Sequence, residues 1–269
     1  MTKPANHKMD GDNAQKTVPV PYKEVMNLFS ETLKQTCTNY KEPELFEGLQ
    51  STYQDMVKRK VLRIDYPNDA NLCRIERLKL NCKVYNQALL HRAILLFEAT
   101  LRALSDRNVY AIALCIRGHY ETTAALGYIH KRCMDFLNQK LSFDDFKNDT
   151  FVQMLSWKEP SKPPQSPDPI QILNQLDDAD KIVYNNLLKP HGNYKQMLRE
   201  NYEFLCNFAH PNFHSNMVAC RYDKENKAVI LRYDDALRKD EFFIGRLKIS
   251  SDIFVWLFDE FRECVERIK

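Results

Sequence analysis

The chain is poor in the features that mark nucleotide-binding folds and disulfide-rich proteins. Only six of its 269 residues are glycine, and neither G-x-G nor G-x-x-x-x-G-K occurs, which excludes the usual P-loop and dinucleotide-binding motifs. None of the eight cysteines forms a C-x-x-C pair. Several lie in apolar helical patterns, which indicates small buried side chains in a reducing cytoplasm. We expect no cofactor and no disulfide framework.

Signals for secretion and membrane insertion are also missing. The first 21 residues contain no apolar segment of the kind found in signal peptides. The most apolar stretch begins at Val109 and ends at Ile129. Its centre carries Arg117, His119 and Glu121, which argues against a transmembrane span. Lys and Arg outnumber Asp and Glu by only 39 to 36, which excludes a polycationic protein. We therefore expect a cytoplasmic protein without a membrane partner.

Hydrophobic periodicity predicts a mainly α fold, an irregular helical bundle. Residues 1–20 are the expected disordered tail, and 21–269 form one helical domain. The segment 107–138 is apolar on nearly all sides, which predicts a central, buried helix. The expected helices are a first one from Pro21 through Phe29 and Leu33, then 43–60, 69–104, 107–138, one from Ser142, 170–188, 193–210, and a last one from Ser250.

Two segments depart from the helical pattern. Five of the twelve prolines fall in 158–169, which predicts an extended surface loop. The runs NMVACRY (216–222) and AVILRY (228–233) are rich in β-forming residues and are joined by a short polar stretch. This pattern predicts a small β-hairpin near 216–233.

The central helix carries a charged pair. Arg117 and Glu121 are four residues apart and share a face, which continues to Tyr128. Because the flanking residues are apolar in every direction, we expect the pair to be buried. One interpretation is a structural ion pair that fixes the helix register. The other is a pocket that presents Arg117 to an anionic group such as a phosphate, with Tyr128 among the substrate-binding residues.

A histidine ends the segment 193–210. Arg199, Asn207 and His210 share one face there, and Pro211 stops the helix directly afterwards. The helix dipole favours a protonated imidazole at this end, so His210 is a candidate general acid or base. Arg199 and Asn207 are candidate substrate-binding residues. The alternative is a solvated polar face that ends in a capping histidine.

Two other chemistries are weaker. Cys206, His210 and His214 have the spacing of zinc ligands on a helix, but Pro211 breaks that helix and no fourth ligand is evident. Nucleophilic catalysis is the second. No G-x-S-x-G motif occurs, and a helix that carries Cys206 and His210 on one surface supplies no oxyanion hole for a Cys–His nucleophile. We expect no metal.

The region from Lys58 to Lys83 is basic. It contains eight Lys and Arg against three acidic residues, a net charge of +5. Such a cluster is typical of a solvated helix face whose long side chains cover apolar surface. The alternative is a contact with the backbone of a nucleic acid, which requires only positive charge.

Two motifs resemble those of an uncharacterised family of bacterial helical proteins. One is R-x3-E, here Arg117 to Glu121, and the other is Y-x2-L-S-x3-H-P, here Tyr202 to Pro211 with Cys206 in place of the serine. That family is distantly similar to the HEPN and abortive-infection proteins, many of which are RNases in phage defence or toxin–antitoxin systems. The resemblance implies a metal-independent endoribonuclease in which Arg117, Glu121 and His210 are catalytic.

Three functions therefore remain open. The first is RNA cleavage, with His210 as general acid and base and Arg117 as the stabiliser of the phosphorane-like charge. The second is a non-catalytic interaction or regulatory module, which binds a protein partner or forms a homo-oligomer. The third is a sensor of a small anionic ligand held at Arg117.

Overall fold

A computed structural model gives the fold and confirms a mainly α bundle with a small β-hairpin. The expected tail at 1–20 and most of the proline-rich segment lie outside the described residues. The structure describes residues 28–39, 43–66, 72–156, 167–192, 194–211, 213–218, 220–231 and 240–269. None of the helices in these ranges is both long and apolar enough to cross a membrane.

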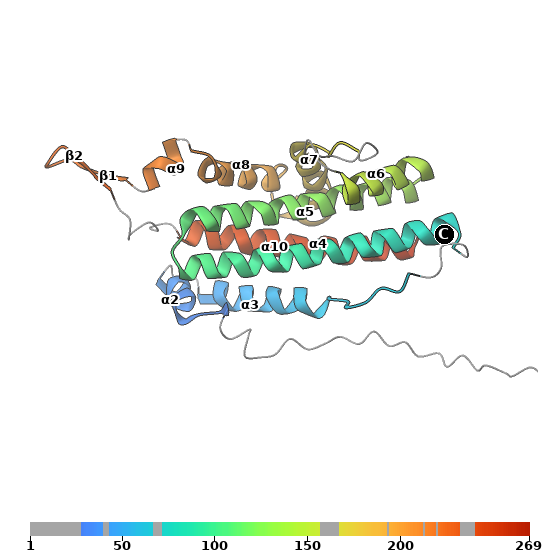
Figure 1. The fold of residues 1–269 in the computed structure, drawn as a ribbon, viewed down its shortest axis with the longest axis horizontal. Coiled ribbons are helices and arrows are strands. Elements are labelled where there is room, and N and C mark those ends of the chain that lie inside the picture. The colour runs from blue at the N-terminus through green and yellow to red at the C-terminus, as the bar shows by residue number, and fades with distance from the viewer. Residues whose placement is uncertain are drawn as a thin grey trace, which may run out of the picture.

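Three long helices form the centre of the bundle: α4 (Arg74–Ser105), α5 (Val109–Leu137) and α10 (Asp240–Glu266). α5 contacts α4 and α10, and it also contacts the helices on its other side, so the predicted central helix is confirmed (Figure 1). Its core-facing side chains, such as Ile116 and Tyr120, are fully buried. Burial of this apolar surface is the main source of stability in such a fold.

Shorter elements cover the two sides of this centre. On one side α2 and α3 pack on α4 and α10, and on the other α6, α7 and α8 pack on α5 (Figure 1). Gly127 of α5 permits the close approach of α7, because a Cβ there would lie 2.5 Å from the Cβ of Ala179. These shorter helices are α2 (Glu31–Asn39), α3 (Pro43–Lys58), α6 (Phe143–Leu155), α7 (Ile172–Val183), a π turn η2 (Tyr184–Leu188), a 3-10 turn η3 (Lys189–His191), α8 (Met197–Ala209) and α9 (Phe213–Val218).

Polar side chains set several helix ends. The Ser142 hydroxyl accepts a hydrogen bond from the Asp145 N–H at 3.1 Å, so the predicted start of α6 is confirmed. The Ser30 hydroxyl accepts from the Leu33 N–H at 3.2 Å and α2 begins at Glu31. The prediction of one helix that runs through Phe29 to Leu33 is therefore wrong. The stretch 21–27 lies outside the described residues.

A buried carboxylate sets the start of α8. Asp180 of α7 accepts hydrogen bonds from the backbone N–H groups of Leu198 and Arg199, at 2.8 and 3.1 Å. This cap explains why the helix begins at Met197 and not at 193 as predicted. Burial raises the pKa of Asp180 to about 6, although the two backbone hydrogen bonds act in the opposite direction.

The last helix begins ten residues before its predicted start. Ser250 and Ser251 lie within α10, and their side chains are fully buried. Both hydroxyls bond to His119 of α5, so they serve a buried polar contact between helices and not a helix cap. A serine–serine–aspartate sequence is typical of helix starts, but packing against α5 decides the outcome here.

The hairpin is shorter than predicted. β1 (Cys220–Asp223) pairs antiparallel with β2 (Ala228–Leu231), and Cys220 lies opposite Leu231. The Asp223 carboxylate accepts from the N–H groups of Glu225 and Asn226 and so closes the turn. Residues 216–218 belong to α9 and not to a strand, which corrects the predicted start of the hairpin. The hairpin projects away from the helices (Figure 1).

Candidate anion-binding groove

The charged pair of α5 forms as the spacing predicts, but it is not buried. Arg117 Nε donates to Glu121 Oε1 at 3.2 Å, and the two side chains keep 24% and 29% of their surface exposed. Further along the same face, Tyr110 and Leu114 are also exposed. The prediction of a fully buried pair is therefore wrong, because this face of α5 is only partly covered by its neighbours.

Tyr202 of α8 completes this pair. Its hydroxyl donates to Glu121 Oε1 at 3.4 Å, and the Arg117 guanidinium lies 5.4 Å from the centre of its ring. Burial acts to lower the pKa of Arg117, but the Tyr202 hydroxyl and the Glu121 carboxylate outweigh it and hold that pKa above its ordinary value. Arg117 is a permanent cation with a fixed position.

A second arginine approaches from α4. Arg92 Nη2 lies 3.7 Å from Glu121 Oε2, and Arg92 Nε donates to the Thr122 hydroxyl at 3.0 Å. The Arg92 side chain is 56% exposed. One carboxylate thus lies between two guanidinium groups, and the cluster carries a net positive charge.

These side chains line an open groove of about 940 Å³, within the size range of sites for small molecules and cofactors. α4, α5, α8, the end of α6 and the segment 168–172 surround it. Gln153 of α6 is fixed there because its Oε1 accepts from the Tyr85 hydroxyl at 3.0 Å. Its Nε2 is buried and has no hydrogen-bond partner among the described residues. Because a tyrosine hydroxyl both donates and accepts, this contact leaves the two ends of the amide interchangeable. The groove therefore combines two cations, the carboxylates of Glu121 and Asp168, and one amide end without a partner.

His210 is not among the residues that line this groove. It is exposed in the extended conformation at the end of α8, and its backbone N–H donates to the Cys206 carbonyl at 3.3 Å. Cys206, one turn earlier, is close enough to Arg117 to contribute to its raised pKa, although burial and Tyr202 have larger effects. Asn207 is half-buried and also lies outside the groove lining.

The other two candidate substrate-binding residues lie elsewhere. Arg199 pairs with Asp177 at 2.8 Å and with Glu203 at 3.0 Å, so its charge is neutralised between α7 and α8. Tyr128 faces α6, where burial and the Asp149 carboxylate raise its pKa to about 12. Neither residue lines the groove at Arg117.

Three residues of the groove receive no role from the sequence: Arg92, Gln153 and Tyr202. Arg92 and Gln153 reach the site from the helices before and after α5, and no spacing within one helix relates them to Arg117. Tyr202 stands in the second motif and eight residues before His210. That motif is the one sequence signal that points to this residue.

Neither the arrangement of possible metal ligands nor the comparisons with known proteins assign a function to this groove. Within the described ranges, no cluster of three or more His, Cys, Asp or Glu residues is arranged to hold a metal ion, and the side chain of His214 lies outside those ranges. The chain matches no protein-family model, no curated protein and no solved structure. The resemblance in the two motifs stays a prediction.

Proposed function

We propose that the groove at Arg117 binds the phosphate group of a ligand. The observation that carries this proposal is the convergence of Arg117 and Arg92 from two helices on one open groove, beside a Gln153 amide with one unpaired end. Guanidinium groups present several N–H donors in a planar fork that matches phosphate oxygens. With phosphate bound in this groove, the protein acts as a sensor of a phosphorylated ligand or as an RNA-binding protein.

The roles of the neighbouring residues follow from their contacts. Glu121 holds both guanidinium groups in place by ion pairing, and Tyr202 supports Arg117 by its hydroxyl and its ring. Arg92 is the more exposed of the two cations, so it is the first to meet a ligand. Positioning by such partners lowers the conformational entropy that binding would otherwise cost.

Binding of a 5′-phosphorylated oligoribonucleotide and of inorganic phosphate tests this proposal by calorimetry. We expect Arg92→Gln and Arg117→Gln each to weaken binding about tenfold, as the loss of one charge-assisted hydrogen bond predicts. Arg199→Gln is the matched control, because it removes an arginine whose charge Asp177 and Glu203 already neutralise. Equal affinity in all four proteins would reject the groove as the phosphate site.

RNA cleavage is the second candidate function. It is favoured by the second motif, in which Tyr202 contacts Arg117 and His210 follows on the same segment, eight residues later. In this mechanism the 2′-hydroxyl attacks the phosphorus and the 5′-oxygen leaves, while His210 transfers the proton between them. Arg117 stabilises the charge that develops on the phosphorane, and Glu121 orients Arg117.

The two candidates are separated by RNA cleavage in EDTA. The cleavage hypothesis predicts strand scission by the wild-type protein and none by His210→Ala, with RNA binding retained in both. Binding without scission would leave the phosphate-binding function alone.

A further inference from the structure

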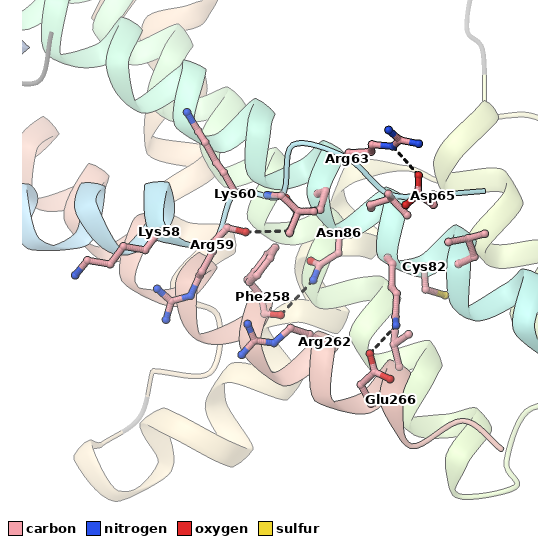
Figure 2. Close-up of a pocket in the computed structure, with 16 residues that line it drawn as sticks. Lys58, Arg59, Lys60, Arg63, Asp65, Cys82, Asn86, Phe258, Arg262 and Glu266 are labelled. Carbon is pink, nitrogen blue, oxygen red and sulfur yellow. Dashed lines mark hydrogen bonds and ion pairs between the residues drawn. The ribbon is translucent and has the colours of Figure 1, made fainter. Parts of the chain in front are cut away.

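A second groove lies on another face of α4, away from the groove at Arg117. It has a volume of about 450 Å³ and is formed by the end of α3, the segment 59–65, α4 and α10 (Figure 2). Gln87 of α4 fixes one wall, since its Nε2 donates to the Arg59 carbonyl at 3.1 Å and its Oε1 accepts from the Val61 N–H at 3.0 Å. This wall is therefore held in shape by the helix below it.

The rim of this second groove is positively charged. Six cationic side chains line it against two carboxylates. The six are Lys58, Arg59, Lys60, Arg63, Lys83 and Arg262. Five of the six form ion pairs: Arg59 and Arg262 share Asp259, Lys83 pairs with Glu266, Lys58 with Asp55 and Arg63 with Asp65. Lys60 makes no ion pair within the described part of the chain, and Arg63 pairs only with the exposed Asp65, so positive charge remains at the rim.

The floor is apolar with one exception. Val61, Leu80, Phe258 and Val265 line it together with Asn86, which is only 4% exposed. Asn86 Nδ2 donates to the Phe258 carbonyl at 3.3 Å, and this contact fixes which end of the amide is the oxygen. Asn86 Oδ1 is buried and has no hydrogen-bond partner among the described residues. A buried acceptor without a donor is unfavourable. A ligand that donates an N–H group to Asn86 Oδ1 would therefore be favoured in this groove.

We infer that this groove binds a nucleoside monophosphate whose base carries an amino group. A suitable ligand must have an anionic group for the rim, a flat apolar body for the floor and an N–H donor for Asn86 Oδ1. A fatty acid has no such donor. The ammonium group of an amino acid would be repelled by the cations of the rim. A nucleotide such as AMP has all three features, and the volume of the groove is in the range of small-molecule sites.

The inference does not rest on the function proposed for the first groove. The residues of α4 that line the second groove, such as Asn86 and Lys83, lie on a different face from Tyr85 and Arg92. Because the phosphate of AMP would also fit the first groove, AMP titrations are repeated in Arg117→Gln, and the AMP binding that persists in this variant is assigned to the second groove. If AMP binding were lost in that variant, the assignment of AMP to the second groove would be wrong.

Calorimetry of the full chain with four ligands is the test. The ligands are AMP, purine riboside 5′-monophosphate (which lacks only the amino group), ribose 5-phosphate and inorganic phosphate. We expect AMP to bind about tenfold more tightly than purine riboside monophosphate, and ribose 5-phosphate and phosphate to bind more weakly still. Equal affinity for AMP and purine riboside monophosphate would overturn the role of Asn86. Equal affinity for AMP and phosphate would reduce the site to a general anion patch, and no heat with AMP at about 1 mM would reject it.

Variants assign the effects to residues. Asn86→Leu is expected to abolish the preference for AMP over purine riboside monophosphate. The double variant Lys60→Gln with Arg63→Gln is expected to weaken AMP about tenfold while that preference is kept. Arg74→Gln, on the exposed start of α4 and outside the groove, is the matched control. Should Asn86→Leu fail to fold, the ligand series on the wild-type protein still decides the question, and an unaltered affinity in the double variant contradicts the proposal.

Discussion

Two polar side chains of α5, His119 and Arg117, are two residues apart and have opposite surroundings. A separation of two residues turns a side chain by about 200° around the helix axis, so the two lie on opposite faces. His119 is completely buried between α5 and α10, where its Nδ1 lies 2.8 Å from the Ser250 hydroxyl and its Nε2 lies 3.4 Å from that of Ser251. Arg117 faces an open groove with a quarter of its side chain exposed.

The comparison shows which polar residue in an apolar helix holds the fold together and which remains available to a ligand. The two hydroxyls serve both ring nitrogens of His119, and burial lowers its pKa to about 3, so the ring is neutral at physiological pH. Arg117 keeps its charge and contacts partners that leave one side of it open. Removal of His119 should therefore affect stability, and removal of Arg117 should affect binding.

The largest effect is expected for His119→Ala. The substitution leaves a cavity between α5 and α10. It also removes the partner of the buried Ser251 hydroxyl and one of the two partners of Ser250, which keeps Thr123. A loss of about 3–5 kcal/mol in the free energy of unfolding is expected from the two effects together. Urea unfolding measures it, with Arg117→Ala as the matched variant on the other face. A loss below about 1 kcal/mol would show that His119 is not a structural residue.

Acid should weaken the fold through the same histidine. The folded-state pKa of about 3 lies below the ordinary value of 6.5, so the unfolded chain binds more protons between these values. Stability is then complete above about pH 6.5 and falls as the pH is lowered, by up to about 1.4 kcal/mol per pH unit. We expect His119→Gln, which carries no titrating group there, to lose less stability between about pH 6.5 and pH 4 than the wild-type protein does.

Asp180 supplies the control for this pH dependence. Its folded-state pKa of about 6 lies above the ordinary 3.8, so the folded chain binds more protons between about pH 4 and pH 6. Asp180 therefore offsets part of the effect of His119 in that range. Asp180→Asn should steepen the loss of stability on acidification, whereas His119→Gln should flatten it. Parallel stability curves for all three proteins would contradict both assignments.

A smaller effect is expected for Arg117→Ala. A fully buried pair would cost about 3–5 kcal/mol when one partner is removed. Because Glu121 keeps 29% of its side chain exposed and retains Arg92 as a partner, a loss of about 1 kcal/mol is expected. Urea unfolding and phosphate binding measured on one preparation check this, since the binding loss should be the larger of the two. A loss of about 3 kcal/mol or more would assign Arg117 to the structural class with His119.

The two faces of α5 differ in how much of their structure can be predicted from the sequence. The helical periodicity predicts α5 and its central place, because an all-round apolar pattern has one stable location in a bundle. It also pairs Arg117 with Glu121, since a spacing of four is local to one helix. It does not reveal that His119 is the buried one, because its partners Ser250 and Ser251 lie more than 130 residues later and have the sequence of a helix cap.

In the candidate site, too, contacts within one helix can be predicted from the sequence and contacts between helices cannot. Arg92 and Gln153 enter the groove through helix packing, and such tertiary proximity leaves no trace in local spacing. Asp180 is a further example, because its capping of α8 crosses from one helix to another and shifts the start of α8 by four residues from the expected 193. Local rules predict elements, whereas the residues that form a groove depend on how those elements pack.

The smallest effect on stability is expected for His210→Ala, at no more than about 0.5 kcal/mol, because the side chain is exposed and makes no hydrogen bond or ion pair with the residues that the structure describes. The substitution alters neither the buried contact of His119 nor the lining of the groove at Arg117. If RNA cleavage is an activity of this protein, His210→Ala should abolish it while the unfolding curve and the affinity for phosphate stay as in the wild-type protein. A folded His210→Ala protein that cleaves RNA at the wild-type rate would exclude His210 as the general acid and base, and the phosphate groove would then have to act without it.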